Sequence, residues 1–285
     1  MTADLFEAHR TRLSRLAYRM LGSVADAEDV VQDAWLRWRR ADQATVTDPG
    51  AWLARVAGRL CLDRLRADRA RRETYVGPWL PEPLVEPLVD DPVERAEAVS
   101  VAFLLTLQRL SPLERAAFLL HDVFEADYAA LAVTLERDEA ACRQLVSRAR
   151  AHVKSARPRF TVSQAEAARL VAAFADAATR NDATALASLL AEDCVFISDG
   201  GGKRKAALRP IVGREDILRF FVGLATRQPW PPPGRHRAAR INGWPGLVVE
   251  DDEVWQTFAF EPGDDGRLRA IYVVRNPDKL ARLPV

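Results

Sequence analysis

The segment from Asp127 to Val153 limits how this chain can fold more than any other. Apolar side chains recur at helical spacing on both sides of a short polar turn, which predicts two short helices joined by that turn. Asp138 ends the turn and is a good N-cap for the second helix. The first helix has its apolar positions at Tyr128, Leu131, Ala132 and Leu135, and the second has them at Ala141, Cys142, Leu145, Val146 and Ala149.

The outward face of the second predicted helix has the chemistry to enter the major groove of DNA. Arginine pairs bidentately with guanine, glutamine pairs with adenine, and serine or arginine holds phosphates. A helical hairpin with an ordinary solvated face is the alternative, because the turn has Glu136 and lacks the glycine often found there. The outward residues are Glu139, Arg143, Gln144, Ser147, Arg148 and Arg150.

Composition excludes several classes of protein. The chain has 285 residues, of which 48% are hydrophobic and 28% charged, and its formal net charge is +1. These values are typical of a soluble globular protein with two or three domains. No apolar run is long enough to span a bilayer, and the N-terminus lacks the apolar core of a signal peptide. Cys61, Cys142 and Cys194 form no CxxC pair, so we expect a cytoplasmic protein without a disulfide framework, metal site or cofactor.

Prolines and acidic residues divide the first half of the chain into blocks. Residues 1–72 and 92–156 have helical periodicity, and residues 73–91, with four prolines, predict an extended acidic linker between two all-α domains. Asp48 before Pro49 predicts the start of a helix, and Ser111 with Glu114 predicts a capping box.

The chain changes character after Pro158. A helix over 164–180 and a second helix that includes Leu186, Leu189 and Leu190 come first. Runs typical of strands follow at 194–198, 246–250, 252–261 and 268–275, separated by turns rich in Gly, Pro and Asp. Residues 160–285 are therefore expected to form an α+β domain, with a helical hairpin followed by a curved antiparallel sheet.

The helix predicted over 51–73 accumulates arginine opposite its apolar face. Neutralising DNA phosphates takes several cations in a row, and Trp52 with loop 41–47 can add stacking or a pocket for an unpaired base. A solvated arginine face on a bundle helix explains the pattern equally well. The arginines are Arg55, Arg59, Arg64, Arg66, Arg69, Arg71 and Arg72.

The helix predicted over 25–40 begins with an acidic stripe. Acids favour helix N-termini, which suffices to explain Asp26 and Glu28. Asp29, Gln32 and Asp33 suit a docking face for another protein equally well.

Taken together, these features resemble the extracytoplasmic-function (ECF) sigma factors of bacterial RNA polymerase. The resemblance covers roughly residues 5–155 and is carried by YRMLGSVADAEDVVQDAWLRWRR, DPGAWLARVAGRLCLDRLRADRARRE and LSPLERAAFLLHDVFEADYAALAVTLERDEAACRQLVSRAR. It implies that residues 25–40 grip core RNA polymerase, that 41–72 recognise and melt the −10 element of promoter DNA, and that 128–150 read the −35 element as duplex.

The resemblance also implies roles for single residues. Trp35, one of the implied polymerase contacts, suits the core of the bundle equally well. The polymerase contacts are Asp29, Gln32, Asp33 and Trp35. The −10 contacts are Trp52, Arg55, Arg59, Arg64, Arg66 and Arg69, and the −35 contacts are Arg137, Glu139, Arg143, Gln144, Ser147 and Arg148.

Residues 160–285 resemble a SnoaL-like domain, a cone-shaped α+β fold used by cyclases, isomerases and binding modules. Three short signatures resemble those of one sigma subgroup that carries such a domain in place of a separate anti-sigma factor. They are Trp79-Leu80-Pro81, Asp199-Gly200-Gly201-Gly202-Lys203 and Asn276-Pro277-Asp278-Lys279-Leu280. The resemblance implies that this domain contacts the sigma linker and regulates promoter engagement. For the glycines alone, a flexible β-turn is the simpler interpretation.

These patterns favour a sigma factor and not an enzyme. A conventional helix-turn-helix regulator is the first alternative, but it leaves residues 25–72 unexplained. A SnoaL-type enzyme or binding protein is the second, and catalysis would need Asp193, Asp199 or Glu253 in a pocket, in a domain whose single histidine is His236. Binding of an unknown small ligand stays open. Removing residues after about Ala270 is expected to raise activity, and removing the whole domain to reduce it.

Overall fold

The computed structural model describes residues 2–87, 99–156, 162–225, 232, 234–251 and 254–283. The chain gathers into two compact units. Met1–Thr74 and Phe103–Arg157 form the first unit, and Tyr75–Ala102 and Pro158–Val285 form the second. No helix among the described residues is both long and apolar enough to cross a membrane.

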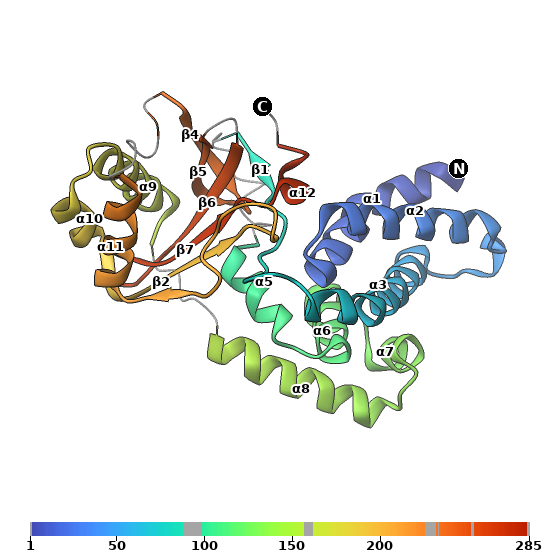
Figure 1. Cartoon of the computed structure of the whole chain (residues 1–285). Helices are drawn as coiled ribbons and strands as arrows, with labels where there is room; N and C mark the ends of the chain where they lie inside the picture. The colour runs from blue at the N-terminus through green and yellow to red at the C-terminus, as the bar shows by residue number, and fades with distance from the viewer. Residues whose placement is uncertain are drawn as a thin grey trace. The chain divides into compact units, whose positions relative to one another are not determined.

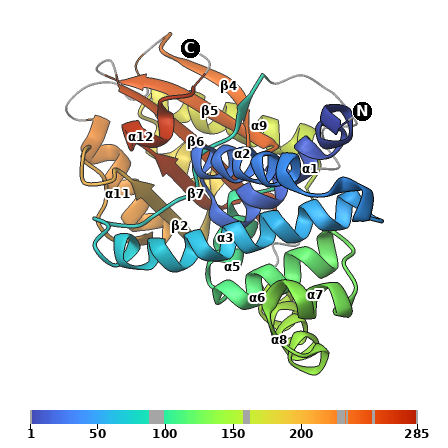
Figure 2. The same ribbon diagram turned by 90° about the vertical axis from the view of Figure 1, so that its right-hand side faces the viewer.

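Three long helices begin the first unit, namely α1 (Thr2–Leu21), α2 (Val24–Arg40) and α3 (Pro49–Glu73), with a short 3₁₀ turn at Gln43–Thr45. They pack against one another around buried side chains that include Leu16, Trp38 and Leu53 (Figures 1 and 2). Oδ1 of Asp48 accepts a hydrogen bond of 2.9 Å from the backbone N of Ala51, which confirms the predicted start of α3. The predicted helical bundle is also confirmed.

Shorter helices follow: α5 (Val101–Gln108), α6 (Pro112–Phe118), a π-helical turn at Leu119–Val123, α7 (Tyr128–Leu135) and α8 (Glu139–Ala156). Ser111 and Glu114 exchange hydrogen bonds through their side chains and backbone N atoms, so the predicted capping box of α6 is confirmed. Oδ1 of Asp138 accepts a hydrogen bond of 2.7 Å from the backbone N of Ala141, which confirms the predicted N-cap of α8.

The turn between α7 and α8 places Glu136 where a glycine is common. Its backbone is left-handed, with φ 55° and ψ 50°, and the N of the following Arg137 donates a hydrogen bond of 3.1 Å to Ala132 O. Glycine usually closes a helix in this way, because a Cβ atom is unfavourable in the left-handed region. The helix-turn-helix therefore forms without glycine, but with local backbone strain at Glu136.

A seven-stranded sheet, in the order β1-β4-β5-β6-β7-β2-β3, crosses the described part of the second unit. Helices α9 (Gln164–Thr179), α10 (Ala183–Leu189) and α11 (Arg214–Ala225) pack on it, and α12 (Pro277–Leu280) follows its last strand (Figure 1). The strands are β1 (Val85–Glu86), β2 (Leu190–Asp199), β3 (Ile211–Val212), β4 (His236–Ile241), β5 (Trp244–Asp251), β6 (Val254–Pro262) and β7 (Leu268–Val274).

An aromatic core joins the helices of the second unit to its sheet. The ring of Phe174 in α9 lies 5.5 Å from that of Phe221 in α11 and 5.0 Å from that of Phe260 in β6, measured between centroids. Phe196 of β2 contacts Phe221 edge-on at 5.7 Å. Burial of each such ring contributes roughly 1.5–3 kcal/mol, so this layer holds the helices against the strands.

The sheet differs from the expectation in several ways. Leu190 begins β2 and does not belong to a helix, and its side chain is fully buried in the core of the second unit. The sheet is mixed and not antiparallel, because β2 lies parallel to β7. Strands β1 and β3 have two residues each, too few for an alternating pattern to reveal them. The prediction also misses β4.

The segment predicted as a linker between the two helical regions is attached to this sheet where the structure describes it. Val85 pairs with Ile241, Glu86 pairs with Arg240, and the O of Leu84 accepts a hydrogen bond of 2.8 Å from Asn242 N. Backbone pairing therefore makes this part of the linker an edge strand of the second unit.

Candidate functional site

Helix α8 exposes the row of polar side chains that the sequence predicts. The Arg143 guanidinium lies 3.2 Å from the carboxylate of Glu139 and 5.3 Å from the ring centroid of Tyr128. Arg148 lies 3.3 Å from Glu114. The pair of Arg143 with Glu139 is exposed on both sides and contributes about 0–1 kcal/mol, whereas the side chain of Glu114 is only 14% exposed. The exposed residues are Arg137, Glu139, Arg143, Gln144, Ser147, Arg148 and Arg150.

Arg59 of α3, a predicted −10 contact, binds the C-terminal end of α7. Its Nη2 donates a hydrogen bond of 2.5 Å to Val133 O, and its Nε donates one of 3.3 Å to Thr134 O. Its Nη2 also lies 3.6 Å from Oε1 of Glu136. Carbonyl groups at a helix C-terminus carry partial negative charge, which favours a guanidinium there. In this conformation Arg59 is engaged with the helix-turn-helix.

Arg64 of α3 joins residues from two predicted sites. Its Nη2 lies 3.0 Å from Oδ2 of Asp33 and 3.9 Å from Oδ2 of Asp29, and its Nη1 donates a hydrogen bond of 2.6 Å to Asp26 O. A predicted −10 arginine therefore neutralises two predicted polymerase-binding acids. This arrangement links α3 to α2 inside the first unit.

Two predicted tryptophans pack against neighbouring rings. Trp52 is half-buried, with its ring centroid 5.4 Å from that of Trp38, and Trp35 is half-buried, with its ring centroid 4.9 Å from that of Phe6. Both side chains therefore contribute to the bundle and are partly exposed.

The remaining predicted −10 residues differ in exposure. Arg66 is exposed and lies 3.3 Å from Asp63, and Arg55 is half-buried. The side chain of Arg69 lies outside the described residues.

The predicted docking face of α2 includes an apolar residue that the sequence analysis missed. Asp29 and Gln32 are exposed, and Asp33 is half-buried. Leu36 is 39% exposed and follows at the same helical spacing, so it lies on this face. The signal in the sequence was the spacing itself, because position 36 follows 29, 32 and 33 on one helical face.

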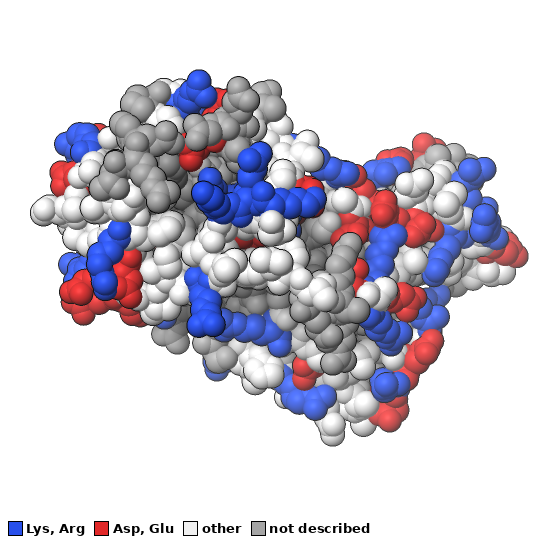
Figure 3. All heavy atoms as spheres, viewed as in Figure 1, with Lys and Arg blue, Asp and Glu red and all other residues white. Residues whose placement is uncertain are grey.

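Charged side chains are interleaved on the face drawn in Figure 3. Over the helices of the first unit, Lys and Arg alternate there with Asp and Glu and do not form one basic patch. This distribution agrees with the formal net charge of +1. Affinity for DNA from this face therefore depends on where single arginines lie.

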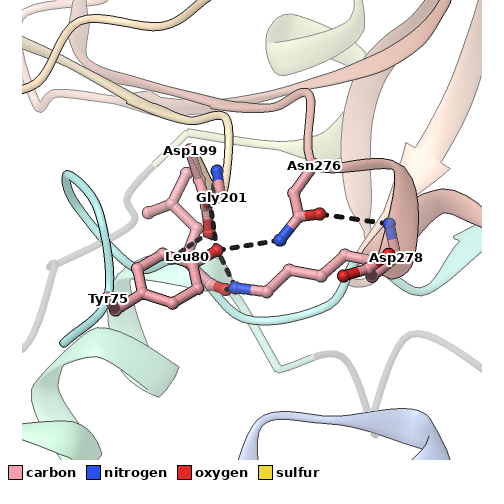
Figure 4. A network of polar contacts seen from close by, with 7 residues as sticks. Tyr75, Leu80, Asp199, Gly201, Asn276 and Asp278 are labelled. Atoms are coloured by element: carbon pink, nitrogen blue, oxygen red, sulfur yellow. Dashed lines mark hydrogen bonds and ion pairs between the residues drawn. The ribbon is translucent and has the colours of Figure 1, made fainter. Parts of the chain in front are cut away.

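In the second unit, the buried carboxylate of Asp199 at the end of β2 joins the three signature segments (Figure 4). Its Oδ1 accepts hydrogen bonds from Tyr75 Oη at 2.6 Å and from Gly201 N at 3.0 Å. Its Oδ2 accepts hydrogen bonds from Leu80 N at 2.8 Å and from Lys279 Nζ at 2.7 Å. Four donors compensate the buried charge, which would otherwise be very unfavourable.

Lys279 and Asn276 complete this network. Lys279 Nζ also donates a hydrogen bond of 2.6 Å to Leu80 O and lies 4.0 Å from the ring centroid of Trp79, a cation–π distance. Asn276 caps α12 and donates a hydrogen bond of 2.9 Å from Nδ2 to Tyr75 Oη. The network fastens the linker to β2 and α12. We call Tyr75, Leu80, Asp199, Asn276 and Lys279 the linker clamp.

The glycine signature packs tightly beside the linker clamp and is not merely a flexible turn. A Cβ atom at Gly200 would collide with the carbonyl of Arg204, and one at Gly201 would collide with the amide of Asn276. Gly201 also has φ 60°, which side chains disfavour. Lys203 and Asp278 form an exposed ion pair at 2.6 Å. Of the other signature residues, Gly202 and Pro277 are exposed, whereas Pro81 and Leu280 are buried.

A cavity of about 220 Å³ lies among α11, β2, β6 and β7. The acids named from the sequence do not form it: Asp193 is exposed, Asp199 belongs to the linker clamp, and Glu253 lies outside the described residues. Its polar lining includes Asp251, Gln256 and Arg275. These residues converge from separate strand ends, so no local pattern in the sequence marks them.

Models of three protein families match the chain. They are Sigma-70 region 2 over residues 5–71, Sigma-70 region 4 over 100–153 and a SnoaL-like domain over 171–281. The ECF RNA polymerase sigma factor SigJ of Mycobacterium tuberculosis (strain ATCC 25618 / H37Rv) is 40% identical over 302 residues, which cover 100% of this chain and 95% of SigJ. The chain belongs to the ECF RNA polymerase sigma factors.

Two further similarities accompany this result. The probable ECF sigma factor SigI of Mycobacterium tuberculosis (strain CDC 1551 / Oshkosh) is 35% identical over 189 residues, 65% of each chain. The crystal structure of Mycobacterium tuberculosis SigJ matches with a TM-score of 0.81 and 37% identity, covering 99% of both chains. The predicted fold, two helical sigma domains followed by a SnoaL-like domain, is therefore confirmed. This ECF sigma factor binds core RNA polymerase and promoter DNA and directs promoter-specific transcription initiation.

Proposed function

We propose that this sigma factor is regulated by its own SnoaL-like domain, which holds the sigma linker in the linker clamp. The observation that carries the proposal is Asp199, a fully buried carboxylate with four donors, two of which belong to the linker. The linker joins region 2 to region 4, so a domain that holds it controls the length of chain between the two DNA-binding regions.

Within this proposal, each helical face has one task. Helix α8 reads the −35 element, and Arg143, Gln144, Ser147 and Arg148 supply the donors. Helix α3 contacts the −10 element, and the exposed face of α2, with Leu36 added, docks on core polymerase. Arg59 must leave the carbonyl groups of α7 before it can hold a DNA phosphate. The contact between α3 and α7 therefore belongs to a resting state.

The SnoaL-like domain acts as a regulator and not as a catalyst in this proposal. Its cavity contains Asp251, whose Oδ2 lies 3.8 Å from Nη2 of Arg275. Among the described residues, the lining of this cavity holds no histidine and no second carboxylate that could act as the acid–base partner of Asp251. A factor that works on polymerase and promoter DNA acts in the cytoplasm, as the sequence predicts.

Run-off transcription with core polymerase and the DNA upstream of the protein's own gene tests the −35 assignment. A double variant, Arg143→Ala with Arg148→Ala, should lower promoter-specific transcripts about tenfold or more, because base and phosphate contacts contribute about 1–3 kcal/mol each. Arg180→Ala is the matched control, since Arg180 is an exposed arginine at the C-cap of α9 and lies 2.7 Å from an acid one turn earlier, Asp176. Equal transcript levels in the double variant and the control would overturn the assignment.

The same assay tests the linker clamp. A cut after Ala270 would remove the end of β7, an interior strand of the sheet, so the expected activating truncation belongs after Arg275. That truncation removes Asn276 and Lys279 but keeps all seven strands. We expect it and Asp199→Asn to change transcript levels in the same direction, upward, and removal of residues 160–285 to lower them. Unchanged levels in both clamp variants would contradict regulation through the clamp.

A further inference from the structure

The cavity of the second unit has a largely apolar wall that is rich in phenylalanine. Phe196 of β2, Phe258 of β6 and Phe220 of α11 line it, and its volume of about 220 Å³ is below the roughly 300–1,000 Å³ of sites for drug-sized ligands. A compact apolar body, one or two rings in size, suits this space.

Two donors in the lining lack a partner among the described residues. Gln256 is only 2% exposed, and its Nε2 makes no hydrogen bond; Nε of Arg275 is buried and also makes none. Leaving a buried donor unpaired is unfavourable, so such groups normally meet an acceptor from a ligand or water. Both residues line the same cavity, so one acceptor group bound there could serve both donors.

The charges of the lining indicate the sign of that acceptor. Among the described lining residues, Arg275 is paired with Asp251 at 3.8 Å, and the exposed Lys205 leaves one positive charge in excess. A single negative charge on the occupant balances this excess.

We propose that the cavity binds a compact aromatic monocarboxylate, with its ring among the phenylalanines and its carboxylate on Gln256 Nε2 and Arg275 Nε. One carboxylate can then accept a hydrogen bond from each donor, because it has two acceptor oxygens.

The same strand ends also form the linker clamp. Successive residues of a strand point to opposite faces, so Ser198 faces the cavity while the next residue, Asp199, belongs to the clamp. Arg275 lines the cavity and is followed by Asn276 of the clamp, and the N atoms of both donate hydrogen bonds to Asp199 O, at 2.8 and 3.0 Å. A ligand that binds Arg275 therefore also affects Asp199 and Asn276 of the linker clamp. This coupling rests on the proposed function, whereas binding does not.

Direct binding to the full-length protein tests the site. Benzoate, trans-cinnamate and 2-naphthoate are titrated by calorimetry and ligand-observed NMR, each beside its neutral alcohol: benzyl alcohol, cinnamyl alcohol and 2-naphthylmethanol. We expect at least one carboxylate to bind saturably and its alcohol to bind about tenfold more weakly, as loss of a charged hydrogen-bond partner predicts. Failure of all three carboxylates to saturate at millimolar concentration would overturn the proposal.

Gln256→Leu keeps the size of the side chain and removes the donor, so it should weaken carboxylate binding about tenfold. The matched control is Gln164→Leu, because Gln164 lies in the same unit and donates a hydrogen bond of 3.0 Å to Gly243 O. Thermal melting checks that both variants fold. An unchanged affinity in Gln256→Leu would overturn the assignment of the acceptor to Gln256.

Run-off transcription with and without the bound carboxylate separates the two proposals. A change of transcript level in the parent protein that is absent in Gln256→Leu supports the coupling, and binding without any change overturns the coupling but not the site. If Asp199→Asn has no effect on transcription while the carboxylate still binds, the proposed clamp function is wrong and the ligand site stands.

Discussion

The ammonium of Lys279 lies 2.7 Å from Oδ2 of Asp199, with 12% of the lysine side chain and none of the aspartate side chain exposed. Removing one partner of such a buried pair leaves an uncompensated charge, which typically costs about 3–5 kcal/mol. Because the pair joins α12 to the end of β2 and its carboxylate also holds the linker, three segments depend on it.

Asp199→Asn should therefore lower the free energy of unfolding of the full-length protein by about 3 kcal/mol, measured by urea denaturation. Lys203→Ala is the control, because its ion pair with Asp278 is exposed and should contribute at most about 1 kcal/mol. Limited proteolysis should cut residues 75–87 faster in Asp199→Asn only. Equal, small losses in both variants would contradict the importance of the buried pair.

Stability should fall at alkaline pH through Tyr75. Burial, followed by the hydrogen bond to Asp199, raises the pKa of Tyr75 above its usual value. A raised pKa means that the folded state holds the phenolic proton more tightly. The contribution of Tyr75 to the free energy of unfolding is therefore fully present below about pH 10, the usual pKa of tyrosine. It is lost as the pH rises further. The urea midpoint of the parent protein should exceed that of Tyr75→Phe at neutral pH, and this difference should shrink above about pH 10. If the difference between the two urea midpoints stays constant with pH, ionisation of Tyr75 is not the cause of the alkaline loss of stability.

Glu136→Gly should relieve the strain in the helix-turn-helix. The left-handed conformation costs a residue with a side chain roughly 1–2 kcal/mol, and glycine avoids this cost. Glu136→Ala is the matched comparison, since both variants lose the exposed contact with Arg59. We expect Glu136→Gly to be about 1 kcal/mol more stable than Glu136→Ala in thermal unfolding. Equal stability would mean that the turn adapts to the side chain.

Gln256→Leu should stabilise the ligand-free protein. An apolar side chain of similar size removes an unpaired buried donor, whose burial costs about 1–3 kcal/mol. Gln164→Leu should instead destabilise the protein, because it leaves the O of Gly243 without its donor. Thermal melting without ligand compares the two. A loss of stability in Gln256→Leu would indicate that Gln256 serves the fold and not a ligand.

The sequence predicts best what depends on near neighbours in the chain. The caps of α3, α6 and α8 are such features, because Asp48, Ser111 and Asp138 each bind a backbone N three residues away. The outward face of α8 follows from helical periodicity in the same way.

Features that depend on distant segments cannot be read in this way. Strand β1 exists because Val85 meets Ile241, and two residues carry no pattern of their own. The sequence resemblance named every residue of the linker clamp except Tyr75, but only the fold shows that Tyr75, Leu80 and Lys279 donate to Asp199. Arg59 suits a phosphate by its charge, yet it binds Val133 O, which no spacing in α3 predicts.

Strand β1 also changes how region 4 is connected. Region 4 is flanked in the sequence by residues 75–102 and 158–285, and both of these segments belong to the second unit. Region 4 is therefore inserted between two segments of that unit. Under the proposed function, release of residues 75–86 from the second unit lengthens the tether between region 2 and region 4. Under the same proposal, opening the linker clamp therefore widens the range of spacings between promoter elements that this sigma factor accepts.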